Sequence, residues 1–451
     1  MNPRIFREYD IRGVADRDLP DNLVRALGLA IGEMAYAGGG PVVIGRDCRL
    51  HSPRLFVALS EGVRVIADVV DIGVVPTPVA YFAQHHLRPA ATVMITGSHN
   101  PAEDNGFKIM IDDATLHGKA IADLRDRVAA LLAQRSLAPA RATHSSHVTE
   151  PYLQHAIAML QTGKRKLKVV VDAGNGAGGP TAVELYTRLG FDVVPLFCEM
   201  DGRFPNHHPD PTQPENLAAL STAVQYVGAE LGIALDGDAD RVGAIDGTGK
   251  ILWGDQLMIL LGRAVLAEVP DARFVGEVKC SQAMYDALPS CEMWKVGHSL
   301  IKERMRETGA QLAGEMSGHL FFAHRWLGFD DGIYAGARLL ELLSRSDRTL
   351  TELAAELPVA VNTPEIRIDC PDELKFDVVT RVIKSLSADP TVLDVITIDG
   401  ARARFADGWG LVRASNTQPA LVMRCEGRDS RSLAEIRGAI EAHIAMARGS
   451  S

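Results

Sequence analysis

Several features that would assign this 451-residue chain to a particular class of protein are absent or scarce. Its six cysteines are scattered and form no C-x-x-C pair, which argues against a disulfide framework or a zinc site and favours reduced, buried thiols. The first residues form no apolar signal segment, and no run approaches the roughly 20 apolar residues of a membrane span. We therefore expect a cytoplasmic protein with no membrane partner.

Positive charge is also in the minority, because the formal net charge is −10. A surface of this sign argues against a nucleic-acid partner. An acidic protein that handles an anionic substrate should therefore concentrate its basic residues in one cleft. Hydrophobic residues make up 47% of the chain, and its length is too great for one core, so three or four domains are expected.

Short apolar runs alternate with helical patterns through most of the chain, which predicts α/β domains with mixed, largely parallel sheets. Near the C-terminus the pattern changes to alternating strands and hairpin turns, as at Asp407-Gly408, which predicts a smaller antiparallel α+β domain. The segment 138–146 is rich in Ala, Ser and Arg and is predicted to be a linker. The predicted domains are 1–146, 147–249, 250–361 and 362–451.

The stretch Thr96-Gly97-Ser98-His99-Asn100-Pro101 follows a short apolar strand. Gly97 is expected to allow an unusual backbone angle just before Ser98. A serine on a tight loop beside an imidazole is a candidate nucleophile. An ordinary polar turn would explain this stretch alone, but other stretches carry complementary chemistry.

Three aspartates, Asp236, Asp238 and Asp240, alternate directly after another buried strand. Their spacing aims three carboxylates to one side if the segment is extended, and oxygen ligands suit Mg²⁺. A calcium loop is excluded, because Arg241 and Gly247 stand where an EF-hand needs Gly and Glu.

Two further loops are weaker signals when taken alone. Gly314 to His319 places Glu315 and Ser317 between glycines, where they could bond sugar hydroxyls. Arg413 to Thr417 groups a guanidinium, two hydroxyls and an amide, which could hold a phosphate, although a polar hairpin turn fits equally well.

Three of these loops, at Ser98, Asp236 and Glu315, follow short apolar strands. Because ligands of open α/β sheets lie at the carboxyl ends of strands, we expect three related units around one central cleft, which the fourth domain can cover. A match to G-x-G-x-x-G at Gly174, Gly176 and Gly179 keeps a dinucleotide-dependent dehydrogenase as an alternative.

Together the four motifs, at 96–101, 236–241, 314–319 and 413–417, resemble the α-D-phosphohexomutase superfamily, specifically its phosphomannomutase/phosphoglucomutase branch. The resemblance covers essentially the whole chain. It implies a heart-shaped molecule of four domains, the last similar to TATA-binding protein. Met316 favours this branch over phosphoglucosamine mutases, which usually carry Gln there.

The resemblance also implies a mechanism. Ser98 would be phosphorylated and, with Asp236, Asp238 and Asp240, would bind one Mg²⁺ per active site. Phospho-Ser98 would interconvert hexose 6-phosphate and hexose 1-phosphate, of mannose, glucose or both, through a bound 1,6-bisphosphate. Glucose 1,6-bisphosphate or mannose 1,6-bisphosphate would serve as activator.

The remaining site residues fall into two groups. Arg241 is expected to stabilise charge at the serine end. Charge stabilisation or proton transfer is assigned without distinction to Arg12, His99, Lys108 and His298. Substrate binding is assigned to Lys279, Glu315, Ser317, Arg413, Ser415, Asn416 and Thr417.

Besides the dehydrogenase, a phosphoglucosamine mutase and a non-catalytic sugar-phosphate sensor are alternatives. The expected partner is a hexose phosphate, and the expected assembly is a monomer, with a dimer as the alternative.

Overall fold

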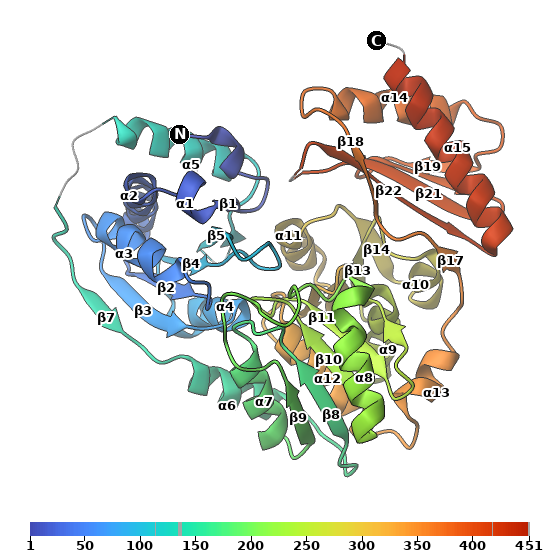
Figure 1. The fold of residues 1–451 in the computed structure, drawn as a ribbon, viewed down its shortest axis with the longest axis horizontal. Helices are drawn as coiled ribbons and strands as arrows, with labels where there is room; N and C mark the ends of the chain where they lie inside the picture. The colour runs from blue at the N-terminus through green and yellow to red at the C-terminus, as the bar shows by residue number, and fades with distance from the viewer. Residues whose placement is uncertain (113, 134–137, 417, 450–451) are drawn as a thin grey trace.

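The structure is a computed structural model that describes residues 1–112, 114–133, 138–416 and 418–449. Four sheets follow one another along the chain, each in a unit of its own (Figure 1). The first unit (blue) and the fourth (red) lie at the two ends of an arc, with the second and third between them. The predicted fold class is confirmed, while the domain limits stay a prediction.

The first unit is a mixed sheet in the order β1-β5-β4-β2-β3-β7, with β6 paired to β5. Its strands are β1 (Ile11–Val14), β2 (Val42–Arg46), β3 (Val69–Val74), β4 (Ala91–Ile95), β5 (Asp104–Ile111), β6 (Ala114–Thr115) and β7 (Thr143–Ser145). Its helices are η1 (Pro3–Ile5), α1 (Ala15–Asp18), α2 (Asp21–Gly38), α3 (Ser52–Val63), α4 (Thr77–Leu87) and α5 (Lys119–Leu132). Strand β7 lies inside the predicted linker. It is fully exposed and pairs with β3, so no apolar pattern marked it.

The second unit has the strand order β12-β11-β10-β8-β9. Its strands are β8 (Lys168–Asp172), β9 (Asp192–Leu196), β10 (Leu231–Leu235), β11 (Val242–Asp246) and β12 (Ile251–Leu252). Its helices are α6 (Thr149–Met159), α7 (Gly179–Arg188), η2 (Pro214–Leu217) and α8 (Ala218–Val227). Strand β10 is buried throughout, which explains its unbroken run of apolar and small residues.

The third unit has the strand order β14-β13-β15-β16. Its strands are β13 (Phe274–Glu277), β14 (Cys291–Trp294), β15 (Leu312–Gly314) and β16 (Leu320–Phe322). Its helices are α9 (Gly254–Glu268), α10 (Gln282–Ala287), α11 (His298–Thr308), α12 (Gly332–Ser344) and α13 (Leu350–Ala355).

The three α/β sheets share one topology. In each, a central strand (β2, β8 or β13) has a parallel neighbour on both sides. One of these neighbours (β4, β10 or β15) also pairs with an antiparallel strand, which is the next strand along the chain. The antiparallel pairs are β4–β5, β10–β11 and β15–β16. The loops of Ser98, Asp236 and Glu315 connect these pairs, so the three motifs occupy one topological position, as expected of related units.

The fourth unit is antiparallel, in the order β17-β22-β21-β20-β19, with β18 paired to β22. Its strands are β17 (Val361–Asn362), β18 (Ile366–Asp369), β19 (Asp394–Ile396), β20 (Ala401–Phe405), β21 (Gly408–Ala414) and β22 (Ala420–Gly427). Helices α14 (Lys375–Ser387) and α15 (Ser430–Gly449) pack on the sheet.

The hydrophobic cores separate the fourth unit from the first three. One continuous core joins residues of the first three units, from Val43 through Tyr152 to Tyr334. The fourth unit has a core of its own, and among the described residues a small apolar cluster around Val278 and Trp409 and hydrogen bonds from Arg402 and Arg424 join it to the third unit. Among the helices of the described segments, none is long and apolar enough to cross a membrane.

Candidate active site

The three motif loops contact one another through their backbones. A Cβ on Gly237 would lie 2.5 Å from the carbonyl oxygen of Ser98, so only glycine allows this approach. The amide of Val242 donates to the carbonyl of Gly318 at 3.0 Å. The acidic loop therefore lies between the serine loop and the Glu315 loop.

Ser98 is buried at the end of β4, and its hydroxyl donates to Asp236 Oδ2 at 3.0 Å. His99 Nδ1 lies 3.4 Å from the same hydroxyl. The prediction of an unusual angle at Gly97 is wrong, because the left-handed residue is Ser98 itself, with φ 50°. Glycine at 97 instead leaves space for Arg49, since a Cβ there would lie 2.6 Å from Arg49 Cζ and would displace this side chain.

Asp236, Asp238 and Asp240 are fully buried and offer ligand oxygens within 4.8 Å of one another. Thr77 Oγ1 donates to Asp238 at 2.5 Å, and Lys108 Nζ bonds both Asp238 and Asp240. One oxygen each of Asp238 and Asp240 has no hydrogen-bond partner among the described residues. Burial, with Asp238 and Asp240, raises the pKa of Asp236 well above its usual value. Clustered carboxylates with unused oxygens fit a hard cation such as Mg²⁺.

Three cationic side chains surround the serine and the acids. Burial disfavours the charge on Lys108, but Asp238 and Asp240 outweigh it and raise the pKa of this lysine. Arg12 donates to Asp10 at 2.7 Å and to the Asn100 side chain at 3.0 Å. Arg241 follows the acids directly, and its backbone N–H donates to Asp236 Oδ1 at 3.2 Å. The site therefore holds fixed positive charge where a phosphate would be transferred.

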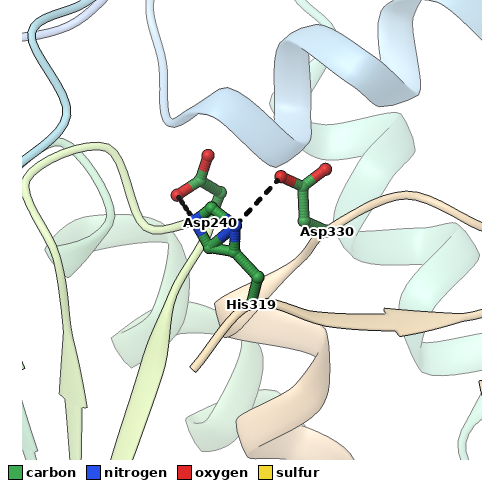
Figure 2. A group of neighbouring side chains, drawn as sticks. All are labelled: Asp240, His319 and Asp330. Atoms are coloured by element: carbon green, nitrogen blue, oxygen red, sulfur yellow. Dashed lines mark ion pairs between the residues drawn. The ribbon is translucent and has the colours of Figure 1, made fainter. Parts of the chain in front are cut away.

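Asp240 also belongs to a second group of buried side chains, together with His319 and Asp330 (Figure 2). Arg241 Nε donates to His319 Nε2 at 2.7 Å, so the neutral ring carries its proton on Nδ1. That nitrogen faces Glu315 Oε2 at 3.2 Å and Asp330 Oδ2 at 3.9 Å. Neither ring nitrogen then has a free lone pair, so in this arrangement His319 holds Arg241 in place rather than binding a cation or accepting a proton.

Three imidazoles in the site are neutral. Burial, helped by nearby cations, lowers the pKa of His99, His298 and His319 well below the usual value. His298 begins α11, and its ring lies edge-on to His319, with centroids 5.7 Å apart. A neutral imidazole with a free nitrogen lone pair can accept a proton, whereas His319, whose Nε2 already accepts from Arg241, and the charged Lys108 cannot.

The residues predicted to hold the sugar lie on the third unit. Glu315 accepts from the Gly297 amide at 2.7 Å, and burial together with Glu277 raises its pKa to about 7. Lys279 Nζ bonds Glu365 at 3.2 Å. Ser317 is half-buried and bonds none of the described residues. The charge of Lys279 acts on the Glu315 carboxyl and opposes part of this rise in its pKa, so these two predicted sugar ligands lie near each other.

The predicted phosphate loop lies at the end of β21. Arg413 Nε donates to Asp399 at 3.0 Å, and its Nη2 has no partner among the described residues. The Asn416 side chain bonds the Tyr9 hydroxyl, which itself donates to the Val296 carbonyl at 2.6 Å. Ser415 is buried beside them, whereas Thr417 lies outside the described residues. Tyr9 therefore connects the first, third and fourth units across the site.

Several site residues were missed by sequence reasoning: Tyr9, Thr77, Lys302, His319 and Asp330. His319 lies inside a motif that the sequence had marked, so its position beside Glu315 was the available signal. The other four lie outside the motifs, and only the tertiary fold brings them to the site.

The glycine-rich turn at 174–179 supports the acidic loop rather than a nucleotide. A Cβ on Gly176 would lie 2.6 Å from the Gly237 carbonyl, which also accepts from the Ala177 amide at 2.9 Å. Because the acidic loop occupies the space in front of this turn, the pattern lends no support to the dehydrogenase.

Comparison with known proteins agrees with this geometry. Family models described as phosphoglucomutase/phosphomannomutase alpha/beta/alpha domains I, II and III match residues 3–134, 150–249 and 253–360, and the C-terminal domain model matches 365–443. A phosphomannomutase/phosphoglucomutase of Pseudomonas putida is 45% identical, covering 96% of this chain and 94% of its own. A phosphoglucomutase of Neisseria gonorrhoeae is 41% identical, covering 98% and 96%. A crystal structure of a family protein from Burkholderia thailandensis superimposes with TM-score 0.91 at 40% identity, covering 100% and 99% of the two chains.

Proposed function

The chain belongs to the phosphoglucomutase/phosphomannomutase family and is a phosphohexomutase, and from this premise we propose that Ser98 carries the transferred phosphoryl group. The observation that carries the proposal is the 3.0 Å contact between the Ser98 hydroxyl and Asp236, inside a buried trio of acids. Phosphoryl transfer depends on positioning and charge neutralisation, and a hydroxyl beside carboxylates that can hold a cation meets both needs.

The reaction is a pair of opposite transfers. The phosphoryl group of phospho-Ser98 forms a bond with a hydroxyl oxygen of hexose monophosphate while its bond to Oγ breaks, and the sugar hydroxyl loses its proton. The resulting 1,6-bisphosphate turns within the cleft. Ser98 Oγ then takes the other phosphoryl group, and the freed sugar oxygen regains a proton. His99 and His298 are the candidates to accept that proton, because burial lowers the pKa of each ring and keeps it neutral, and neither ring is occupied by a bond from Arg241 as His319 is.

Charge at the reacting end is balanced by the chain and by a cation. Lys108 and Arg241 supply fixed positive charge, and Lys108 also neutralises two of the acids. Asp236, Asp238 and Asp240 would hold Mg²⁺, which when bound neutralises charge on the transferring phosphoryl group. The unused oxygens of Asp238 and Asp240 support this assignment.

The distal phosphate is proposed to bind Arg413, Ser415, Asn416 and Thr417, and the sugar to bind Lys279, Glu315 and Ser317. Arg413 supports this role, because its Nη2 is buried without a partner among the described residues. The proposed substrates are the phosphates of mannose, glucose or both, with glucose 1,6-bisphosphate or mannose 1,6-bisphosphate as activator.

Replacing Ser98 by alanine tests the proposal. Mutase activity, assayed with added glucose 1,6-bisphosphate, should fall by about 10³-fold or more. Intact-protein mass spectrometry should find a phosphoryl group on the wild type and none on the variant. Ser60→Ala is the matched control, since Ser60 is a buried serine of α3 whose hydroxyl has no partner in the described structure. Near wild-type activity of Ser98→Ala would refute the proposal.

A further inference from the structure

The serine loop lies on a guanidinium that is completely buried. Arg49 Nη2 donates to the carbonyls of Ser98 at 2.7 Å and Asn100 at 2.6 Å. Its Nη1 donates to the carbonyls of Pro101 at 2.5 Å and Asp104 at 2.9 Å. The Arg49 side chain is 0% exposed, and Asp47 balances its charge at 3.2 Å. One side chain thus donates hydrogen bonds to four backbone carbonyls in and after the loop that contains Ser98.

The conformation that Arg49 holds is an unfavourable one. Ser98 has φ 50°, a region that residues with a Cβ avoid unless their surroundings enforce it. A carbonyl bonded to a fixed guanidinium cannot rotate away, so the Arg49–Ser98 bond opposes relaxation of this backbone. The Ser98 amide is held by Thr96 Oγ1 at 2.8 Å. With both backbone groups fixed, the hydroxyl faces Asp236.

Two neighbours lie close to the guanidinium. A Cβ on Gly97 would come within 2.6 Å of Arg49 Cζ. Arg49 Cζ also lies over the ring of Phe204 from the second unit, 4.9 Å from its centroid. These contacts limit how far the guanidinium can move, and a fork of hydrogen bonds to several carbonyls requires such a fixed plane.

We propose that Arg49 is a positioning residue, which holds Ser98 in the left-handed conformation so that its oxygen meets the acids and the sugar in line. The proposal rests on the proposed phosphorylation of Ser98. Among the described residues no bond joins Arg49 to the three acids of the 236–240 loop, and Asp47 balances its charge, so its effect is geometric rather than electrostatic. Loss of this hold should slow transfer at Ser98 and leave binding at the distal end of the cleft unchanged.

Arg49→Met tests the proposal, because it removes every donor and retains an apolar side chain. We expect kcat to fall by about 100-fold, as a displacement near 1 Å of a reacting atom does, while KM for glucose 1-phosphate changes by less than about threefold. The rate at which glucose 1,6-bisphosphate phosphorylates the dephosphorylated enzyme, followed by intact mass, should fall in parallel. Arg49→Lys keeps the charge without the fork, and it should recover only part of kcat.

Arg165→Met is the matched control. Arg165 also donates to three carbonyls, those of Leu343, Ser346 and Arg348, but far from Ser98 in the sequence and outside the site. Its loss should lower the unfolding temperature and leave kcat and the phosphorylation rate near wild type. An equal fall of kcat in both variants would mean that Arg49 contributes only to the stability of the fold, and it would overturn the proposal.

Gly97→Ala keeps the test valid if Arg49→Met does not fold. The φ of Gly97 is not positive, so alanine is tolerated by the backbone, and the added methyl acts only by displacing the guanidinium. We expect kcat to fall by about fivefold or more with KM retained. Wild-type kcat in both Arg49→Lys and Gly97→Ala would contradict the proposal. Failure of the wild type to accept a phosphoryl group on Ser98 would instead refute the proposed function.

Discussion

The two ends of the proposed cleft are constructed in opposite ways. At the reacting end, Ser98 and the three acids are buried, and their loops contact one another backbone to backbone across units that share one core. At the distal end, the loop of Arg413 and Asn416 belongs to a unit with a separate core, and Asn416 reaches the first unit through Tyr9. This difference is what we expect if the chemistry requires a rigid site and the fourth unit moves to admit and release the substrate.

The first prediction concerns the acids at the reacting end of the cleft. Asp238→Asn removes a charge that Lys108 and Thr77 both contact, and it should lower kcat by about 10³-fold. Steady-state kinetics at several Mg²⁺ concentrations measure this loss and the raised requirement for the cation. Asp246→Asn is the control, because Asp246 is also buried, in β11, and its side chain bonds the turn residues Thr248 and Lys250. Unchanged kcat in Asp238→Asn would show that the acidic trio is not part of the chemistry.

The second prediction concerns the glycine-rich turn that contacts the acidic loop at the reacting end. Gly176→Ala places a methyl group against the Gly237 carbonyl and should displace the acidic loop. We expect kcat to fall by about tenfold to 100-fold, with a higher Mg²⁺ concentration needed for half-maximal activity. Wild-type kinetics in this variant would show that the glycine-rich turn does not position the acids.

The third prediction addresses the distal end. Tyr9→Phe removes the hydroxyl that joins Asn416 to Val296, and the loss of these bonds should raise KM by about tenfold. Because the reacting end stays intact, kcat should change by less than about threefold. A kcat loss comparable with that of Asp238→Asn would remove the distinction between the two ends.

The fourth prediction lies outside both ends and is the smallest. Gly438 lies exposed within α15, and a Cβ there meets no atom within 4 Å. Gly438→Ala should raise the free energy of unfolding by about 0.5–1 kcal/mol and leave kcat and KM unchanged. Urea unfolding followed by circular dichroism measures the gain. Destabilisation would mean that α15 is packed differently.

Local patterns were sufficient to predict the parts of the site that lie next to strands in the sequence. Asp236, Asp238 and Asp240 were recognisable because their spacing has a chemical reason, and the serine loop because a buried strand ends in turn residues. The left-handed residue was assigned to Gly97 instead of Ser98, because a glycine usually has this conformation and the contact with Arg49 is not visible in the sequence. Thr77, Tyr9 and Asp330 could not be found, since only tertiary packing brings them to the motifs.

The most direct test of the account follows the phosphoryl group of Ser98 through one turnover. Enzyme labelled with radioactive phosphate from glucose 1,6-bisphosphate is freed of sugar and mixed rapidly with unlabelled glucose 6-phosphate. The account predicts that label maps to Ser98 by peptide analysis and passes to the sugar with a rate constant at least equal to kcat. Label that stays on the protein through many turnover times, or that maps to another residue, would contradict it.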